Sequence, residues 1–215
     1  MARGQRTTAT KIIVVAASKG GSGKTTVMTA LGAQAALEGK VALIDVDPQE
    51  STVRFWELRG SPDNPKFFQI RGGLAATLDR VRAEGFDYAF IDTPPALLPT
   101  IQSAVHLADA CLIVTQTTAL DLEAIGPVVE MAKKAEVPFA FVLNRVEPRW
   151  RLETDAAKYL KSDGRVLKEL VTNRQSYASA PVAGRSGAEV GDKVAAEEIA
   201  ALWKAVKRMM SARAK

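Results

Sequence analysis

The chain has 215 residues, of which 47% are hydrophobic and 25% charged, and its formal net charge is +5. This length suits one α/β domain with a sizeable core, and the composition is that of an ordinary globular protein. The sequence has no run of 18 apolar residues that would predict a membrane span, and its basic start lacks the apolar core of a signal peptide.

Apolar runs alternate with helical patterns along the chain. The predicted strands cover residues 12–17, 41–46, 67–70, 87–92, 110–115 and 138–143. The predicted helices cover residues 24–38, 73–84, 99–107, 120–135, 152–161 and 193–212. This alternation predicts a single α/β domain over residues 12–215, in which a mostly parallel sheet is covered by helices on both faces, after a basic tail of residues 1–11.

The most informative segment lies between the first predicted strand and the first predicted helix. Glycines there allow backbone N–H groups to point into one hollow, and the helix that follows adds the positive end of its dipole. In such a loop Lys24 can reach the β- and γ-phosphates of a nucleoside triphosphate, and the Thr25 hydroxyl can bind Mg²⁺. The predicted nucleotide-binding residues are Lys19, Gly20, Gly21, Ser22, Gly23, Lys24, Thr25 and Thr26.

Two positions distinguish this loop from the strict Gly-x4-Gly-Lys-Ser/Thr pattern. Ser18 occupies the position of the first glycine, and Lys19 adds a second lysine at the start of the loop. A glycine-rich turn by itself is a weak signal, because many turns contain glycine for steric reasons. The full motif between a strand and a helix is a strong indication of phosphate binding.

Three aspartates follow predicted strands further along the chain. Asp45 and Asp47 lie at the end of one strand, and Asp92 ends the strand over residues 87–92. In open parallel sheets, ligands bind outside the carboxyl ends of the strands, so these carboxylates are expected beside the glycine-rich loop. There they can hold metal-bound water and orient the attacking water. A single aspartate of this kind could equally be a helix cap or a turn residue.

These three segments resemble the ParA family of partition ATPases, which belongs to the deviant Walker-A group that also contains MinD. The similarity extends over nearly the whole chain. Residues 112–116 and 141–145 are similar to later strands of the family, and residues 174–199 are similar to its C-terminal signature. The short segment before the first predicted strand resembles the short ParA type, which lacks an N-terminal helix-turn-helix domain.

The resemblance implies a role for each residue of the phosphate site. Lys24 would bind the β- and γ-phosphates of ATP, and Thr25 would be a direct Mg²⁺ ligand. Lys19 would be the signature lysine, which reaches across a homodimer to the partner's nucleotide. Together with Asp47, these two lysines are the expected catalytic residues.

Carboxylates and one asparagine complete the implied site. Asp47 would position or activate the hydrolytic water, while Asp45 and Asp92 would support Mg²⁺. Asn144 would lie near the adenine, although an ordinary turn asparagine is an equally good interpretation. Glu50 occupies a position at which many relatives have glycine, which leaves the switching behaviour of this loop open.

The last predicted helix has an apolar face and a basic face. At 100° per residue, Lys204, Arg208 and Lys215 lie opposite the apolar stripe. The basic face could be a solvated face of a core-packed helix, or a patch that binds DNA phosphates together with Arg174. A MinD-like membrane helix is the third interpretation. The apolar stripe comprises Ile199, Leu202, Trp203, Val206 and Met210.

The resemblance implies a cytoplasmic, Mg²⁺-dependent ATPase switch. ATP would close a homodimer that binds double-stranded DNA nonspecifically on the nucleoid, and a ParB-like partner would stimulate hydrolysis and release it. The cargo would be a plasmid, a chromosome region or a protein cluster. Conjugative DNA transfer and MinD-like positioning on a membrane are the alternatives within the same family.

Two other classes of protein fit less well. A dethiobiotin-synthetase-like ligase would need a polar substrate pocket that the sequence does not indicate. A nitrogenase-iron-protein-like carrier needs two cluster-ligating cysteines per chain, whereas Cys111 is the single cysteine and is expected in the core. His106 has no plausible metal partner nearby in the sequence and is expected to be structural.

Overall fold

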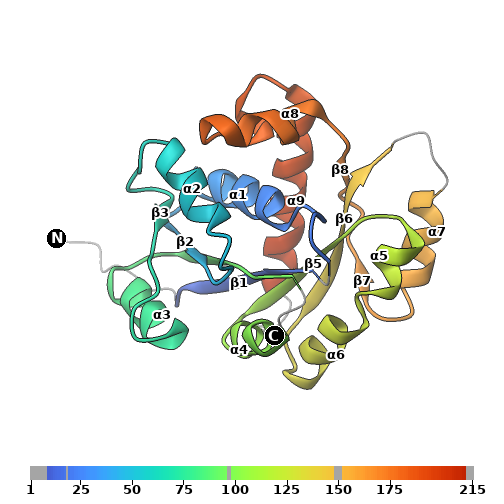
Figure 1. The fold of residues 1–215 in the computed structure, drawn as a ribbon, viewed down its shortest axis with the longest axis horizontal. Helices are drawn as coiled ribbons and strands as arrows, with labels where there is room; N and C mark the ends of the chain where they lie inside the picture. The colour runs from blue at the N-terminus through green and yellow to red at the C-terminus, as the bar shows by residue number, and fades with distance from the viewer. Residues whose placement is uncertain (1–8, 18, 96–97, 148–151, 212–215) are drawn as a thin grey trace.

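The computed structural model of the chain describes residues 9–17, 19–95, 98–147 and 152–211. These residues form an eight-stranded parallel sheet with the order β3-β2-β4-β1-β5-β6-β7, and β8 pairs with β6 outside this path (Figure 1). The strands are β1 (Lys11–Ala16), β2 (Val41–Asp45), β3 (Lys66–Phe67), β4 (Tyr88–Asp92), β5 (Ala110–Thr115), β6 (Phe139–Val146), β7 (Arg165–Val166) and β8 (Val171–Thr172).

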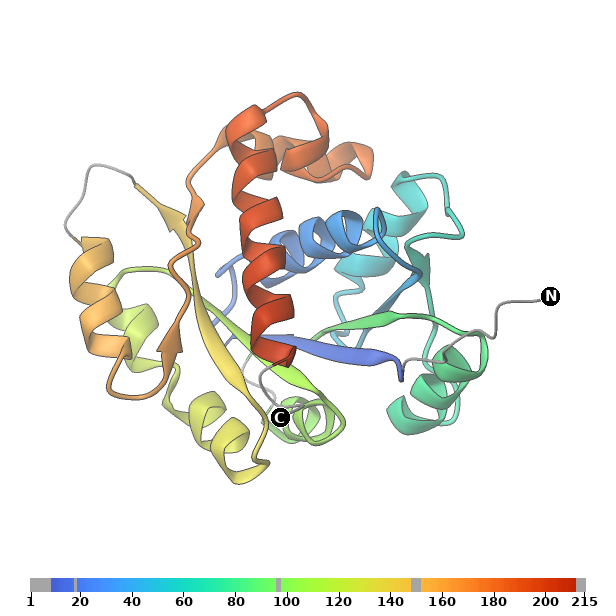
Figure 2. The same cartoon turned by 180° about the vertical axis from the view of Figure 1, so that it is seen from behind.

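Helices cover both faces of the sheet (Figures 1 and 2). α1 and α9 pack on one face, whereas α3, α4, α6 and α7 pack on the other. The central strands are buried on both sides, which explains their nearly continuous apolar sequences. The helices are α1 (Lys24–Ala35), α2 (Ser51–Leu58), α3 (Leu74–Ala83), α4 (Leu98–His106), α5 (Ala119–Glu123), α6 (Gly126–Lys134), α7 (Leu152–Leu160), α8 (Gln175–Ser179) and α9 (Lys193–Ser211).

The register of the sheet brings the predicted site together. Asp45 of β2 pairs with Asp92 of β4, and Val15 near the end of β1 pairs with Asp92 from the other side. The carboxyl ends of three neighbouring strands therefore meet at one edge of the sheet. The loop between β1 and α1 begins at the same edge, as the sequence predicted.

The last helix is part of the core. Trp203 of α9 is 1% exposed, and its ring packs edge-on against Tyr88, with ring centroids 4.9 Å apart. All five residues of the predicted apolar stripe are buried, while Lys204 and Arg208 are exposed on the opposite side. The stripe is therefore occupied by the sheet and is not available to a membrane. None of the helices in the described residues has the length and apolarity needed to cross a membrane.

The structure corrects several predicted boundaries. The single helix predicted over residues 120–135 is wrong, because α5 ends at Glu123 and α6 begins at Gly126, where Pro127 can start a new helix but cannot continue one. The strand predicted over residues 67–70 is reduced to the two residues of β3. The sequence-based prediction did not include α2, α8, β7 or β8. The five residues of α8 and the two residues each of β7 and β8 are too few to show a periodicity. The eight residues of α2 are amphipathic, so this helix could have been found from the sequence.

Cys111 has the core position that the sequence predicted, whereas the structural role of His106 stays a prediction. Cys111 is fully buried in β5, and burial raises the pKa of its thiol to about 12, which makes it an inert core residue. His106 is exposed at the end of α4, where its Nδ1 lies 2.8 Å from the Gln102 carbonyl oxygen of the preceding turn.

Candidate nucleotide-binding and hydrolysis site

The loop between β1 and α1 depends on glycines with left-handed backbone conformations. Gly21 and Gly23 have φ angles of 79° and 90°, which L side chains rarely adopt. A Cβ atom at Gly23 would collide with the Asn144 amide, so a side chain there would displace Asn144 from the loop. Gly23 is also the N-cap of α1, whose first-turn N–H groups have no partner within the helix and are available to an anion.

Two amide side chains support this loop from the neighbouring strands. Asn144 of β6 is buried and donates from Nδ2 to the Ser22 carbonyl oxygen at 2.7 Å. Gln116, just after β5, donates from Nε2 to the Gly21 carbonyl oxygen at 3.1 Å. The interpretation of Asn144 as a turn residue is therefore wrong. Its contact with adenine stays a prediction, beside a role in shaping the loop that the sequence did not indicate.

The two lysines of the loop occupy different environments. Lys24 is 7% exposed in the first turn of α1. The side chain of Lys19 is 52% exposed, and its Nζ lies 3.3 Å from Oδ1 of Asp121. Asp121 is itself oriented by Thr118, whose hydroxyl donates to Oδ2 at 2.5 Å. Lys19 therefore has an acidic partner within its own chain, which the sequence analysis did not predict.

Asp92 lies at the centre of the site. It is buried, and its Oδ2 accepts hydrogen bonds from the hydroxyls of Thr25 in α1 at 2.5 Å and of Thr52 in α2 at 3.1 Å. Burial raises the pKa of Asp92 to about 6, although the hydrogen bond from Thr25 acts in the opposite direction. One carboxylate thus connects the phosphate loop to the helix that follows Asp47.

The described residues fit a Mg²⁺ ion that is held mainly by nucleotide phosphates. Oδ1 of Asp92 is buried and has no hydrogen-bond partner among the described residues. An unpaired buried carboxylate oxygen is costly, so beside the phosphate loop it indicates a ligand. No group of three or more His, Cys, Asp or Glu side chains in the described residues could hold a metal. A buried carboxylate beside a phosphate loop suits Mg²⁺, which uses one or two carboxylates, water and substrate phosphates.

Asp45 organises the loop that carries Asp47. Its Oδ1 accepts the Asp47 N–H at 2.9 Å, and its Oδ2 accepts the Thr52 N–H at 2.9 Å. Burial raises the pKa of Asp45, and the backbone hydrogen bond from Thr52 opposes this shift. Glu50 has a left-handed φ of 52°, a conformation that glycine adopts more easily than glutamate. Asp47 is half-buried at the mouth of the site.

A cavity of about 600 Å³ opens beside the phosphate loop. Gly23 and Thr26 line one side of it, and Asn144 lines the strand side. The opposite wall belongs to β8, α8 and the segment between them, residues 172–178. This position and volume suit the nucleoside part of a nucleotide whose phosphates lie in the loop.

Comparisons with known proteins agree with this geometry. Residues 13–186 match the model of the CobQ/CobB/MinD/ParA nucleotide binding domain. The chain is 30% identical to the maintenance of carboxysome distribution protein A of Halothiobacillus neapolitanus over 200 residues, which cover 87% of this chain and 92% of that protein. It is 27% identical to the chromosome-partitioning ATPase Soj of Thermus thermophilus over 144 residues, covering 53% of this chain and 58% of that protein.

The fold is also that of solved structures. The ATP complex of a Cyanothece McdA variant superposes with a TM-score of 0.78 at 20% identity, covering 93% of this chain and 97% of that one. The chain belongs to the CobQ/CobB/MinD/ParA nucleotide-binding family. It is a ParA/MinD-type ATPase that uses ATP and Mg²⁺.

Two of the residues predicted to bind DNA in this ParA/MinD-type ATPase, Arg174 and Arg208, form ion pairs within the chain that the sequence did not indicate. Arg174 is ion-paired with Asp192 and Glu198, at 3.4 and 3.7 Å, so two acidic groups already offset its charge. Arg208 is exposed, but its Nη2 donates to Glu169 at 2.9 Å. Lys204 is exposed, and Lys215 lies outside the described residues. Contact of these residues with DNA stays a prediction.

Three residues of the ParA/MinD-type site were missed by the sequence analysis. Gln116 supports the loop, and Asp121 supports Lys19, from segments about a hundred residues away, and nothing in their local sequence indicates these contacts. Thr52 follows Asp47 by five residues, in the first turn of α2. Its hydroxyl closes this loop onto Asp92 across 40 positions, and the local sequence does not indicate this contact.

We expect Thr52 to be essential for hydrolysis and not for nucleotide binding in this ATPase. Thr52→Val keeps the shape of the side chain but removes the hydroxyl, which leaves Asp92 with one donor fewer and costs about 1–3 kcal/mol at the site. The expected result is a loss of ATP turnover of about tenfold or more, with ADP affinity unchanged in calorimetry.

Thr52→Ser is the matched control, because it restores the hydroxyl without the methyl group. Turnover in Thr52→Ser should remain within a few-fold of the natural protein. Equal turnover in the valine and serine variants would show that the hydroxyl does not orient Asp92.

Proposed function

We propose that this chain is a nucleotide switch in which ATP closes a homodimer and hydrolysis opens it. The observation that carries the proposal is the different placement of two lysines in one loop. Lys24 is buried at the start of α1, where it serves the nucleotide of its own chain. Lys19 is half exposed and available to the nucleotide of a second copy.

The ion pair between Lys19 and Asp121 is weak enough for Lys19 to leave it and contact the nucleotide of a second copy. Ion pairs with an exposed partner contribute about 1 kcal/mol or less, because water screens them and long side chains lose entropy. A phosphate in a closed dimer offers Lys19 a charge-assisted contact that water screens much less than it screens the present pair, in which the Lys19 side chain is 52% exposed. Dimer closure therefore replaces a weak contact within the chain by a stronger one between chains.

Hydrolysis depends on the loop between β2 and α2. Asp47 orients the attacking water, a role that contributes about 10²- to 10⁴-fold to the rate. Asp45 fixes this loop by accepting the Asp47 and Thr52 N–H groups. Mg²⁺, when bound, neutralises charge on the β- and γ-phosphates.

The same loop transmits the nucleotide state. Because Thr52 links α2 to Asp92, loss of the γ-phosphate alters the contacts of α2 as well as those of the site. A partner protein that completes the water-orienting arrangement then controls the lifetime of the dimer. By resemblance this partner is ParB-like and bound to the cargo.

The function that this switch serves is the distribution of a cargo over DNA. Support comes from relatives whose names refer to carboxysome distribution and to chromosome partitioning. On α9, Lys204 and Arg208 supply an exposed basic face, although Glu169 neutralises part of it. Each patch is weak alone, and dimer closure joins two of them, so ATP strengthens DNA binding through avidity.

Positioning on a membrane is not the function that we propose. The apolar stripe of α9, which a membrane helix would have to expose, is buried against the sheet, with Trp203 at its centre. The DNA-bound dimer therefore accounts better for the two faces of α9 than a membrane-bound one.

The division of labour between the two lysines is tested by their alanine variants. Lys19→Ala should keep nucleotide binding and lose ATP-dependent dimerisation, because only the contact between chains is removed. Lys24→Ala should lose nucleotide binding, since the β- and γ-phosphates lose their buried cation. Light scattering after size exclusion with a slowly hydrolysed ATP analogue measures the first, and calorimetry measures the second. A Lys19→Ala protein that still dimerises with the analogue contradicts the proposal.

DNA binding is tested by a salt titration with ATP and with ADP. Changing Lys204 and Arg208 to Gln should weaken the ATP form and reduce the slope of log affinity against log salt by about 0.9 for each lost phosphate contact. ATP-dependent dimerisation should remain. Lys161→Gln, exposed after α7 on the other face of the sheet, is the control. Equal DNA affinity in the two nucleotide states would argue against a switch.

A further inference from the structure

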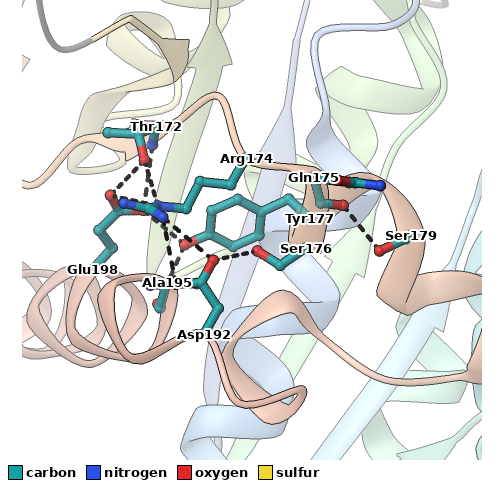
Figure 3. A network of polar contacts seen from close by, with 9 residues as sticks. All are labelled: Thr172, Arg174, Gln175, Ser176, Tyr177, Ser179, Asp192, Ala195 and Glu198. Carbon is teal, nitrogen blue, oxygen red and sulfur yellow. Dashed lines mark hydrogen bonds and ion pairs between the residues drawn. The ribbon is translucent and has the colours of Figure 1, made fainter.

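A network of polar contacts connects the segment of residues 172–177 to α9 (Figure 3). Glu198 of α9 accepts hydrogen bonds from the Thr172 hydroxyl at 2.6 Å, from the Thr172 N–H at 3.3 Å and from the Tyr177 hydroxyl at 2.9 Å. Arg174 donates from Nε to the Thr172 hydroxyl oxygen at 3.0 Å and lies 3.7 Å from Glu198. One carboxylate thus contacts three residues of the segment.

A second carboxylate fixes the same segment at the start of α9. Asp192 accepts hydrogen bonds from the Ala195 N–H at 3.1 Å and from the Ser176 hydroxyl at 2.8 Å. These two donors, the backbone N–H first, hold the pKa of Asp192 below its usual range, and Arg174 adds to the shift. Asp192 therefore caps α9 and anchors α8 at the same time (Figure 3).

The anchored segment is one wall of the cavity beside the phosphate loop. Thr172, Arg174 and Tyr177 line this cavity of about 600 Å³ across from Gly23 and Thr26. Tyr177 is nearly buried, and a Cβ at Gly187 would lie 2.7 Å from its ring, so its position is fixed from behind as well. The wall is thus held by α9 and has little freedom of its own.

We infer that Glu198 is a positioning residue that sets the affinity of the site for the nucleoside part of ATP. The inference rests on the proposed placement of the nucleotide phosphates in the loop. With the phosphates there, the nucleoside occupies the adjacent cavity and meets the wall that Glu198 holds. Glu198 does not touch the nucleotide, and it acts through Thr172 and Tyr177.

This position separates the effect of Glu198 from that of the phosphate loop. A ligand that consists of phosphates alone fills the loop but not the cavity, so its affinity does not depend on the wall. ATP fills both, and its affinity falls when the wall loses its support. Inorganic tripolyphosphate with Mg²⁺ is therefore the probe that distinguishes a positioning role from a general loss of stability.

The variant to test is Glu198→Gln, which keeps the size of the side chain and removes its charge. We expect ATP affinity to fall by about 2- to 30-fold, the range of couplings carried through packed contacts. Tripolyphosphate affinity should stay within twofold. Glu197→Gln is the matched control, because Glu197 is exposed one position earlier on α9 and should leave both affinities unchanged.

Tyr177→Phe provides a second variant if Glu198→Gln folds poorly. It keeps the buried ring and removes only the hydroxyl that donates to Glu198, so it should also weaken ATP and spare tripolyphosphate. The inference is overturned if ATP affinity is unchanged in both variants, or if ATP and tripolyphosphate weaken equally.

Lys24→Ala distinguishes this failure from a failure of the proposed site. Both ligands should lose affinity in Lys24→Ala, because both depend on the buried cation of the loop. A Lys24→Ala protein that still binds both ligands would overturn the placement of the phosphates, whatever the effect of Glu198.

Discussion

The buried carboxylate of Asp92 is the contact on which the rest of the site depends. It lies at the end of a central strand, and one of its oxygens accepts hydroxyl hydrogen bonds from Thr25 in α1 and Thr52 in α2. The other oxygen has no hydrogen-bond partner among the described residues, so no contact there offsets the free-energy cost of removing it from water. A cation or a cation-bound water relieves this cost, so the arrangement is complete only when the ligand is bound.

The two connections of Asp92 explain why nucleotide binding and switching belong to one structural unit. Thr25 belongs to the phosphate loop, and Thr52 belongs to the helix that follows the catalytic loop. Asp45 adds a second connection, because it accepts N–H groups from both Asp47 and Thr52. The left-handed Glu50 lies between these anchors and bears a conformation that glycine would adopt more easily. The hydrogen bonds to Asp45 and Asp92 therefore fix the conformation of the loop between β2 and α2.

The sequence predicted what depends on local pattern. The phosphate loop, the aspartates at strand ends and the main strands follow from glycine spacing and apolar runs, and the sheet register then brings Asp45 and Asp92 together. Contacts between distant segments could not be predicted in this way. Gln116 supports Gly21 across 95 positions, and no local signal marks it.

The charge of the basic face of α9 also depends on residues that are distant in the sequence. A helical wheel correctly places Lys204 and Arg208 opposite the apolar stripe. The wheel cannot show acidic residues from other segments. Glu169, which lies 39 positions earlier, pairs with Arg208. Glu38, in the turn after α1, pairs with Lys207. Arg174 likewise finds its acidic partners on a neighbouring helix. Net charge along one helix therefore overestimates the charge that DNA would meet.

If Asp92 couples the phosphate loop to Mg²⁺, its substitution should change ATP binding only when the metal is present. Asp92→Asn keeps one oxygen that can accept from the two threonine hydroxyls, replaces the other oxygen by an NH₂ donor and removes the charge. Calorimetry of ATP binding is therefore compared in Mg²⁺ and in EDTA. We expect equal ATP affinity in EDTA for the natural protein and the variant, and a loss of about 10- to 100-fold of the Mg²⁺-dependent gain in the variant. An Asp92→Asn protein that keeps the full Mg²⁺-dependent gain would show that Asp92 does not couple the loop to the metal.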